Sequence, residues 1–325
     1  MNQEERQSVL AVIVLFGLRS QASISLETLQ RSALRVSTCG IRLKVILHDN
    51  GPGGESGRCL PNNVLYELSP GNVGLAVAYN KALQMAQRIG AQWLLTLDQD
   101  TALPENYLPR MCALMELYAS DTRIAAIVPQ IIGNGKLLSP YWLWAKALPR
   151  WFPRGYSGIP EHPVYAFNSG SVLRVDALTE IGGYSPLFPL DNSDTNLYHQ
   201  LGKAGKRVFV AGDLRVEHEL SLLDMNRRMP IDRYRRLLFD ECAFWDIEMN
   251  VLARVERKLR LLGRLYKHLV CAHRADLRVA TFKELCRRMF VPRRRRLDQW
   301  RKNCCHTEPA SPESSNEAQI VGDGR

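Results

Sequence analysis

The 325-residue sequence has eight scattered cysteines but contains no Cys-x-x-Cys pair. Paired cysteines at that spacing are typical of zinc sites, so we expect no zinc and read these cysteines as reduced thiols of a cytoplasmic protein. Long hydrophobic runs are also lacking, because the apolar stretch Val9–Phe16 is much too short to cross a bilayer. Glu4 and Glu5 precede that stretch and no small-residue cleavage site follows it, so we expect no signal peptide.

Two further absences narrow the function. No glycine-rich phosphate loop with a following lysine lies near the first predicted strand, which disfavours a nucleotidyltransferase. The net charge is +10, and the segment Val251–Lys302 holds 17 Lys or Arg against 4 Asp or Glu. The remainder of the chain is therefore slightly acidic. No recognised nucleic-acid motif accompanies the basic segment, so we expect no nucleic-acid partner.

Hydrophobic patterning predicts an α/β fold. Continuous or alternating apolar runs typical of strands occur at Val9–Phe16, Ile41–Leu47, Val64–Leu68 and Leu94–Leu97. Helical spacing separates them in residues 26–34 and 71–83. The order β-α-β-β-α-β favours a mostly parallel, Rossmann-like sheet flanked by helices. A helix over Pro104–Tyr118 and a strand over Ile124–Val128 should follow. Leu137–Glu161 has no clear period, so we expect an irregular loop that shapes an acceptor pocket.

The stretch Leu94–Thr101 is the strongest candidate for chemistry. The pattern predicts a buried strand that stops at Asp98-Gln99-Asp100, where an extended chain would point both carboxylates the same way. Adjacent like charges repel, and a divalent cation removes that cost. Carboxylate oxygens suit Mg²⁺ or Mn²⁺, and ligands of open α/β sheets bind at the carboxyl ends of the strands. The alternative is a solvated turn, in which Asp is common.

Other polar positions are candidates with ordinary structural alternatives. Asp49 follows the second strand, where an acidic residue can meet a nucleotide, although it also precedes an Asn-Gly turn. His218 ends a predicted strand over Leu214–Ser221, where a lone histidine is more often structural. Asp191 and Asp194 stand before a predicted helix over Asp194–Ala204.

The ordered motifs NVGLAVAYN, TLDQD, NSGS, LDNSD and EHELS resemble those of inverting family-2 GT-A glycosyltransferases. The resemblance runs from about Val9 to about Asp246 and is nearest to bacterial rhamnosyltransferases that use dTDP-L-rhamnose. Departures include Leu15-Phe16-Gly17, where the family usually has Thr-Tyr-Asn, and Asn196, where it often has Glu.

The resemblance implies a role for each motif. It makes Asp98 and Asp100 the metal and donor-diphosphate site, with His218 near the metal. It makes Asp49 the contact to the nucleotide base. Donor binding on the following helix is implied for Asn72, Gly74 and Asn80. The base is implied to be Asp194, at the start of a helix whose dipole stabilises the anion, while Asp191 is the alternative acidic group of the same motif.

The basic C-terminal region predicts helices. Leucines and valines between Val251 and Leu269 recur every three or four residues, and a second basic helix is expected at about Asp276–Met289, before Arg293–Arg296. These helices either pack on the first domain with a solvated basic face or bind an anionic membrane surface. We expect a GT-A domain at residues 1–246, basic amphipathic helices at 247–302 and a disordered tail at 303–325.

The sequence thus favours a metal-dependent rhamnosyltransferase for O-antigen-type surface polysaccharide, transferring to a saccharide or lipid-linked acceptor. We expect it in the cytoplasm, peripheral to the inner face of the membrane. Two alternatives remain open: an inactive glycosyltransferase-like protein that binds membrane or nucleic acid, and a nucleotidyltransferase on a similar sheet. The intact Asp98, Asp100 and Asp194 argue against the inactive protein.

Overall fold

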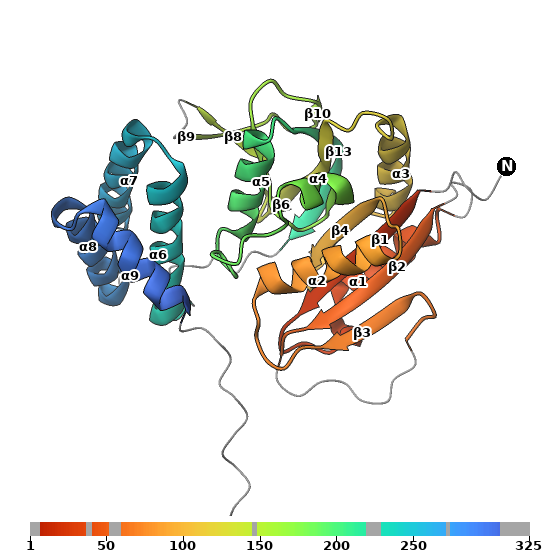
Figure 1. Ribbon diagram of the computed structural model, residues 1–325, viewed down its shortest axis with the longest axis horizontal. Helices are drawn as coiled ribbons and strands as arrows, with labels where there is room; N and C mark the ends of the chain where they lie inside the picture. Colours follow the sequence, from red (N-terminus) through yellow and green to blue (C-terminus); the bar gives the residue numbers. More distant parts are fainter. Residues whose placement is uncertain are drawn as a thin grey trace, which may run out of the picture.

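The computed structural model describes residues 7–36, 41–51, 60–144, 148–218, 229–270 and 274–305. An α/β domain holds a twisted sheet with helices on both faces, and four helices pack beside it (Figure 1). The expected α/β fold with a mostly parallel sheet is confirmed. Among the described residues, no helix is long and apolar enough to span a membrane.

The main sheet has one continuous path of hydrogen-bonded strands. In their order across the sheet they are β10 (Ser157–Gly158), β13 (Arg207–His218), β6 (Ile124–Gly133), β12 (Ser171–Arg174), β4 (Trp93–Asp98), β1 (Ser8–Leu15), β2 (Arg42–Asp49) and β3 (Val64–Leu68). The β1, β2, β3 and β4 strands are parallel, while β12 runs antiparallel between β4 and β6. Two short strands lie off this path, β5 (Thr101–Ala102) on β13 and β7 (Lys136–Ser139) on β6.

The alternation of side chains along β1 divides the core into two layers. All of its residues are buried, as expected for a central strand covered on both faces. Leu10, Val12 and Val14 face one layer of helices, whereas Val9 and Ile13 face the other. The first layer contains α2 (Leu75–Arg88), α4 (Val175–Glu180) and α5 (Ser193–Lys203). The second contains α1 (Ile24–Ala33) and α3 (Tyr107–Leu117).

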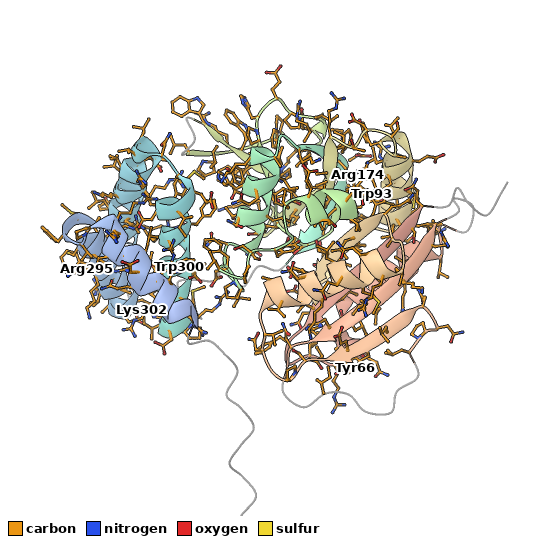
Figure 2. All side chains as sticks on the ribbon, in the orientation of Figure 1. Tyr66, Trp93, Arg174, Arg295, Trp300 and Lys302 are labelled. Carbon is orange, nitrogen blue, oxygen red and sulfur yellow. The ribbon has the colours of Figure 1, made fainter. Side chains whose placement is uncertain are left out.

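A cation–π contact fixes the antiparallel strand within this sheet. The Arg174 guanidinium at the end of β12 lies 4.4 Å from the centre of the Trp93 ring at the start of β4 (Figure 2). The same guanidinium donates to the backbone oxygens of Ile124 and Tyr118. Burial lowers the pKa of Arg174, yet these acceptors satisfy its donors. One buried cation therefore joins β12, β4 and the start of β6.

The expectation of an irregular loop over Leu137–Glu161 is wrong. The segment contributes β7 and β10 to the main sheet. It also forms β8 (Tyr141–Trp144) and β9 (Leu148–Trp151), which pair with β11 (Val164–Tyr165) in a second sheet. Strands of two to four residues are too short to show a period of two, so the pattern could not reveal them.

The C-terminal helices form a unit with its own core. They are α6 (Ile231–Glu248), α7 (Val251–Val270), α8 (Ala275–Phe290) and α9 (Arg293–Cys305). The expected boundary at residue 246 falls inside α6, and of the expected tail, residues 306–325 lie outside the described residues. Trp300 of α9 is buried against Phe188 of the α/β domain, with ring centres 5.3 Å apart (Figure 2). This contact and its neighbours attach the helices to the α/β domain.

Buried ion pairs hold these helices together. Asp246 of α6 accepts from Arg288 of α8 and Arg296 of α9, and all three side chains are buried. Glu241 of α6 pairs with Arg257, which is 2% exposed, and with a second arginine of α7. Several arginines of the basic segment are therefore interior residues rather than a solvated face.

Candidate functional site

Two of the predicted carboxylates lie at the carboxyl edge of the parallel strands. Asp98 is the last residue of β4 and is paired in register with Val14 of β1. Asp49 is the last residue of β2 and is paired with Leu15 of β1. Only one strand separates the two acids. The sheet thus gathers them where open α/β sheets bind ligands.

The Asp98 carboxylate is held from two directions. The Tyr79 hydroxyl of α2 donates to Oδ1 at 3.3 Å, and the Ser169 hydroxyl donates to Oδ2. Ser25 Oγ donates to the backbone oxygen of Asp98. Gln99 joins the ends of two strands, because its Oε1 accepts from the Phe16 amide at 2.8 Å. The strand end is therefore ordered, and the Asp98 side chain remains partly exposed.

Asp100 does not lie on the extended strand that the sequence suggested. The β4 strand ends at Asp98, and residues 99 and 100 form a turn before β5. A common direction for the two carboxylates therefore does not follow from strand alternation. The backbone of His218 pairs with Thr101, so β13 brings His218 next to the residue that follows Asp100. No cluster of three possible metal ligands occurs among the described side chains, which do not include that of His218.

Asp49 is anchored at the end of β2. Its Oδ2 accepts from the Tyr66 hydroxyl at 2.5 Å, and its Oδ1 accepts from the Gly51 amide at 2.8 Å. The next residue, Asn50, donates to the backbone oxygen of Gly74 at 3.3 Å. Asp49 is therefore fixed at the end of β2, while Asn50 connects that strand end to the start of α2, and a nucleotide contact at Asp49 stays a prediction.

The Asn72–Gly74 loop lies against a distant segment. Asn72 Oδ1 accepts from the Gly74 amide at 3.1 Å. Gly74 has a φ of +83°, and a Cβ there would stand 2.5 Å from the backbone oxygen of Pro189. Glycine alone fits this close approach. Asn80, farther along α2, donates from Nδ2 to the backbone oxygen of Tyr184 and accepts at Oδ1 from the Tyr184 amide, each at 2.8 Å. Asn80 therefore positions that turn.

Asp194 occupies the first turn of α5 among tyrosines and acids. Its Oδ1 accepts from the Thr195 amide at 2.6 Å. The side chain keeps some contact with solvent, yet burial raises its pKa to about 6, and the charges of Asp98 and Asp191 add to this effect. In turn, burial and the charge of Asp194 raise the pKa of Tyr141. The structure therefore brings Asp194 within electrostatic reach of Asp98.

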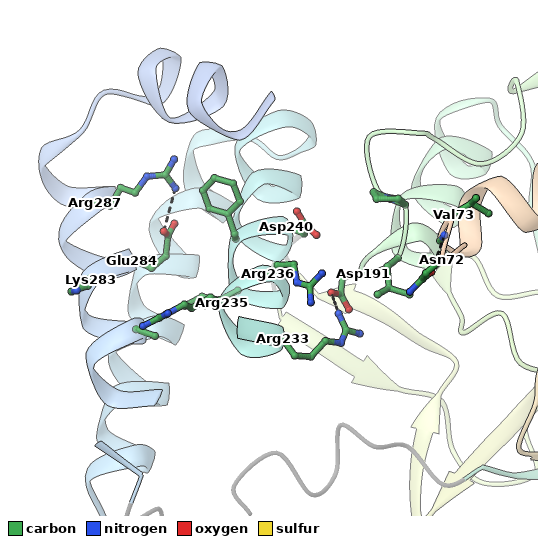
Figure 3. Close-up of a pocket in the computed structure, with 16 residues that line it drawn as sticks. Asn72, Val73, Asp191, Arg233, Arg235, Arg236, Asp240, Lys283, Glu284 and Arg287 are labelled. Carbon is green, nitrogen blue, oxygen red and sulfur yellow. Dashed lines mark hydrogen bonds and ion pairs between the residues drawn. The ribbon is translucent and has the colours of Figure 1, made fainter. Parts of the chain in front are cut away.

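Asp191 has a different environment from that of Asp194. Its Oδ2 accepts from Arg233 of α6, and the carboxylate is 7% exposed (Figure 3). Burial raises the pKa of Asp191, although the hydrogen bond from Arg233 opposes that shift. Asp191 thus joins its loop to the C-terminal helices.

A cavity of about 580 Å³ lies between the start of α2 and helices α6 and α8 (Figure 3). Asn72, Gly74 and Asp191 line it, whereas Asp98 and Asp194 are not among its lining residues. Its basic lining residues are Arg233, Arg235, Arg236, Lys283 and Arg287. They outnumber the acidic ones, so the cavity suits an anionic group.

A second cavity, of about 820 Å³, has an aromatic lining that includes Trp142, Trp144 and Tyr165. The Trp142 ring stacks on His162 with centres 4.1 Å apart. Tyr165 also stacks on Tyr141, whose hydroxyl is the one near Asp194. Residues 137–161 thus contribute to the lining of this cavity. That the cavity binds an acceptor stays a prediction.

Three side chains at these sites were missed from the sequence. Ser169 lies in the polar interruption that the pattern showed, but nothing indicated that it would meet Asp98. Tyr79 sits at a helical position typical of core residues. Arg233 comes from a helix outside the resemblance motifs, so its ion pair with Asp191 carried no sequence signal.

Comparison with solved structures gives the same fold at low identity. S. aureus TarS 1-349 in complex with UDP-GlcNAc matches with a TM-score of 0.50 and 14% identity over 90% of this chain and 84% of that one. GalNAc-T7 with UDP, GalNAc and Mn²⁺ matches with a TM-score of 0.51 and 14% identity over 88% of this chain and 56% of that one. A longer TarS chain is covered over 50% of its length, so this chain spans half of that relative.

Comparison of the sequence with curated proteins gave no match. A family model does match residues 41–182, a range that includes Asp49, Asn72, Gly74, Asp98 and Asp100 and ends before the LDNSD segment. That family is described as Glycosyl transferase family 2. Residues 41–182, less than half of the chain, therefore match the glycosyl transferase family 2 model, and the fold of the chain is similar to that of TarS 1-349.

Proposed function

We propose that this protein is an inverting glycosyltransferase that moves a sugar from a nucleotide-sugar donor to an acceptor hydroxyl. The observation that carries the proposal is the electrostatic coupling of Asp98 and Asp194. Asp98 stands at the carboxyl end of β4 in the matched region, and burial, with a smaller contribution from the charge of Asp98, raises the pKa of Asp194. A single displacement requires a group that binds the donor, here Asp98, and a carboxylate basic enough to take the acceptor proton, here Asp194.

The donor side uses the ends of β2 and β4. Asp49 and the Asn72–Gly74 loop flank the region assigned to the nucleotide, and the Tyr66 and Gly51 contacts keep Asp49 fixed. Asp98 and Asp100 would hold Mg²⁺ or Mn²⁺, with His218 as a further candidate ligand. Their oxygen-rich chemistry and the pairing of His218 with Thr101 fit that assignment. The cation would neutralise charge on the departing diphosphate.

The acceptor side uses Asp194. The carboxylate takes the proton from the acceptor hydroxyl as that oxygen forms its bond to the anomeric carbon. The bond from this carbon to the diphosphate oxygen breaks, and the nucleoside diphosphate departs on the opposite face. One displacement inverts the anomeric centre. Asp191 is the weaker candidate base, because Arg233 already occupies its carboxylate.

The donor sugar and the acceptor form the finer part of the proposal. The motif resemblance supports dTDP-L-rhamnose as donor and a saccharide or lipid-linked acceptor in surface polysaccharide synthesis. TarS and GalNAc-T7 were solved with UDP-GlcNAc and with UDP and GalNAc, so uridine donors belong in the same trial.

The test is hydrolysis and transfer across a panel of nucleotide sugars, with Mg²⁺, with Mn²⁺ and with chelator. We expect one donor to be used, and Asp194→Asn to lower kcat by about 10²–10⁴, the usual contribution of a general base. Donor affinity, measured by calorimetry, should change little in that variant. Wild-type activity in Asp194→Asn together with an inactive Asp191→Asn would reverse the two roles. No turnover of any donor would refute the proposed function.

A further inference from the structure

Helix α7 exposes most of its large apolar side chains, whereas an ordinary amphipathic helix packs them on a core. Its buried residues are Ala253, Arg257, Leu261 and His268. Its large apolar residues are exposed, with Leu252 at 66% and Leu259 at 62%. The full exposed set on α7 is Val251, Leu252, Val255, Leu259, Leu262, Tyr266, Leu269 and Val270. At about 100° per residue these positions fall within roughly 100° of arc, so they form one stripe.

Helix α8 shows the same arrangement. Val279, Phe282, Met289 and Phe290 are 49–78% exposed, and they too recur at helical spacing. The opposite sides of both helices meet α6, because Leu261 of α7 and Leu277, Ala280 and Leu285 of α8 share a core with Tyr234 and Leu238. The exposed stripes therefore face away from α6. Figure 1 shows α7 and α8 on the side of the helical unit remote from the α/β domain.

Buried ion pairs explain why the apolar side can face outward. Arg257 is 2% exposed beside Glu241, and Arg264 pairs with the same carboxylate. Arg288 of α8 pairs with Asp246. Because of these ion pairs, the sides of α7 and α8 that carry Arg257, Arg264 and Arg288 face α6. A rotation of either helix that buried its exposed apolar residues would break these ion pairs and remove arginines that neutralise the α6 carboxylates.

Cations lie beside the exposed apolar residues. On α7, Lys258 and Lys267 flank the stripe on its two sides, and both keep contact with solvent. On α8, Arg278 precedes Val279 and is also partly exposed. Arg295 and Lys302 of α9 are exposed as well (Figure 2). Apolar side chains bordered by cations suit the interface of an anionic lipid bilayer. Two copies of this surface would bring like charges together.

We propose that the outer surface of α7 and α8, here called the α7–α8 face, docks on an anionic lipid bilayer. The leucines, valines and phenylalanines enter the headgroup region, and Lys258, Lys267 and Arg278 meet lipid phosphates. Helix α8 also supplies Ala280 and Lys283 to the cavity beside Asp191. Docking would hold that cavity near the membrane. The proposal does not depend on the catalytic one, because lipid binding needs neither donor nor metal.

The experiment is sedimentation of the full chain with two kinds of vesicle. One is pure phosphatidylcholine and the other is an equal mixture with phosphatidylglycerol. We expect sedimentation with the mixture, weakened by salt, and little with phosphatidylcholine alone. A variant with Leu259→Gln, Leu262→Gln and Phe282→Gln should lose at least about a hundredfold in partition coefficient, since each buried leucine contributes about tenfold or more.

Matched variants separate the face from general surface effects. Leu117→Gln removes an equally exposed leucine, 66% exposed on α3, and should bind vesicles as the wild type does. A charge variant, Lys258→Gln with Lys267→Gln and Arg278→Gln, should lose the preference for phosphatidylglycerol. All variants should keep the wild-type thermal melting point, because the changed side chains reach solvent.

Three results would overturn the proposal. The first is equal sedimentation of the wild type and the Leu259, Leu262 and Phe282 variant. The second is absence of wild-type binding to the mixed vesicles. The third is a stable dimer in analytical ultracentrifugation that this triple variant abolishes, which would assign the face to a second copy of the chain.

Discussion

The raised pKa of Asp194 gives a pH profile that distinguishes this residue from an ordinary carboxylate. With a pKa of about 6, Asp194 is about nine-tenths ionised at pH 7 and about one-tenth ionised at pH 5. A base must be ionised to take a proton, so kcat/KM should fall about tenfold between those pH values. A carboxylate at the ordinary value of 3.8 would remain about nine-tenths ionised at pH 5 and lose almost no rate.

The assay is kcat/KM for transfer at fixed Mg²⁺ or Mn²⁺, because this ratio reports the groups of the free enzyme. Nucleoside-diphosphate affinity measured at both pH values controls for loss of the metal. The residual rate of Asp194→Asn should be flat across the same range. A wild-type profile that is flat down to pH 5, or an unchanged break near pH 6 in Asp194→Asn, would refute the assignment of the base.

Three other predictions test the structure. Asp100→Ala should abolish transfer and weaken nucleoside-diphosphate binding only when Mg²⁺ or Mn²⁺ is present, as calorimetry would show; activity in EDTA would contradict this. Asp246→Asn removes the buried charge shared by Arg288 and Arg296, of which Arg288 keeps Glu284, and should lower the free energy of unfolding in urea by about 3–5 kcal/mol, whereas exposed Asp232→Asn should change it little. In Gly74→Ala the new Cβ would clash with the backbone oxygen of Pro189, so the melting temperature and the donor affinity should both fall. A wild-type melting temperature and donor affinity in this variant would contradict the predicted clash.

The sequence predicted the first half of the fold well because its strands are long and buried. The β1 strand spans eight consecutive buried residues, and β4 ends at the Asp98 where the apolar run stops. The second half of the fold was harder to predict from the sequence. The antiparallel β12 strand has four residues and lies between strands distant in sequence, a placement that no local pattern encodes. The short strands β8 and β9 were missed because four residues are too few to show a period of two.

The candidate site shows a similar limit. The motifs located Asp49, Asp98 and Asp194, and the fold brings Asp98 and Asp194 within electrostatic reach. Patterning could not reveal which polar atoms were already engaged. The motif resemblance implied donor binding for Asn80, whereas its Nδ2 and Oδ1 both hydrogen-bond to the Tyr184 backbone, more than a hundred positions away in the sequence. Likewise Arg233 approaches Asp191 from a helix that the motifs do not reach.

Helix α7 shows how a correct pattern can leave orientation undetermined. Spacing of three and four residues predicts a helix with one apolar side, and α7 is that helix. The same spacing cannot say whether the apolar side or the charged side meets the core. Here acids on α6 decide it, because Glu241 receives Arg257 and Arg264 from α7. Leucines that would ordinarily fill a core are thereby left on the surface. A charge pattern on one helix, read with the acids of its neighbour, thus determines which side of an amphipathic helix remains free to bind a partner.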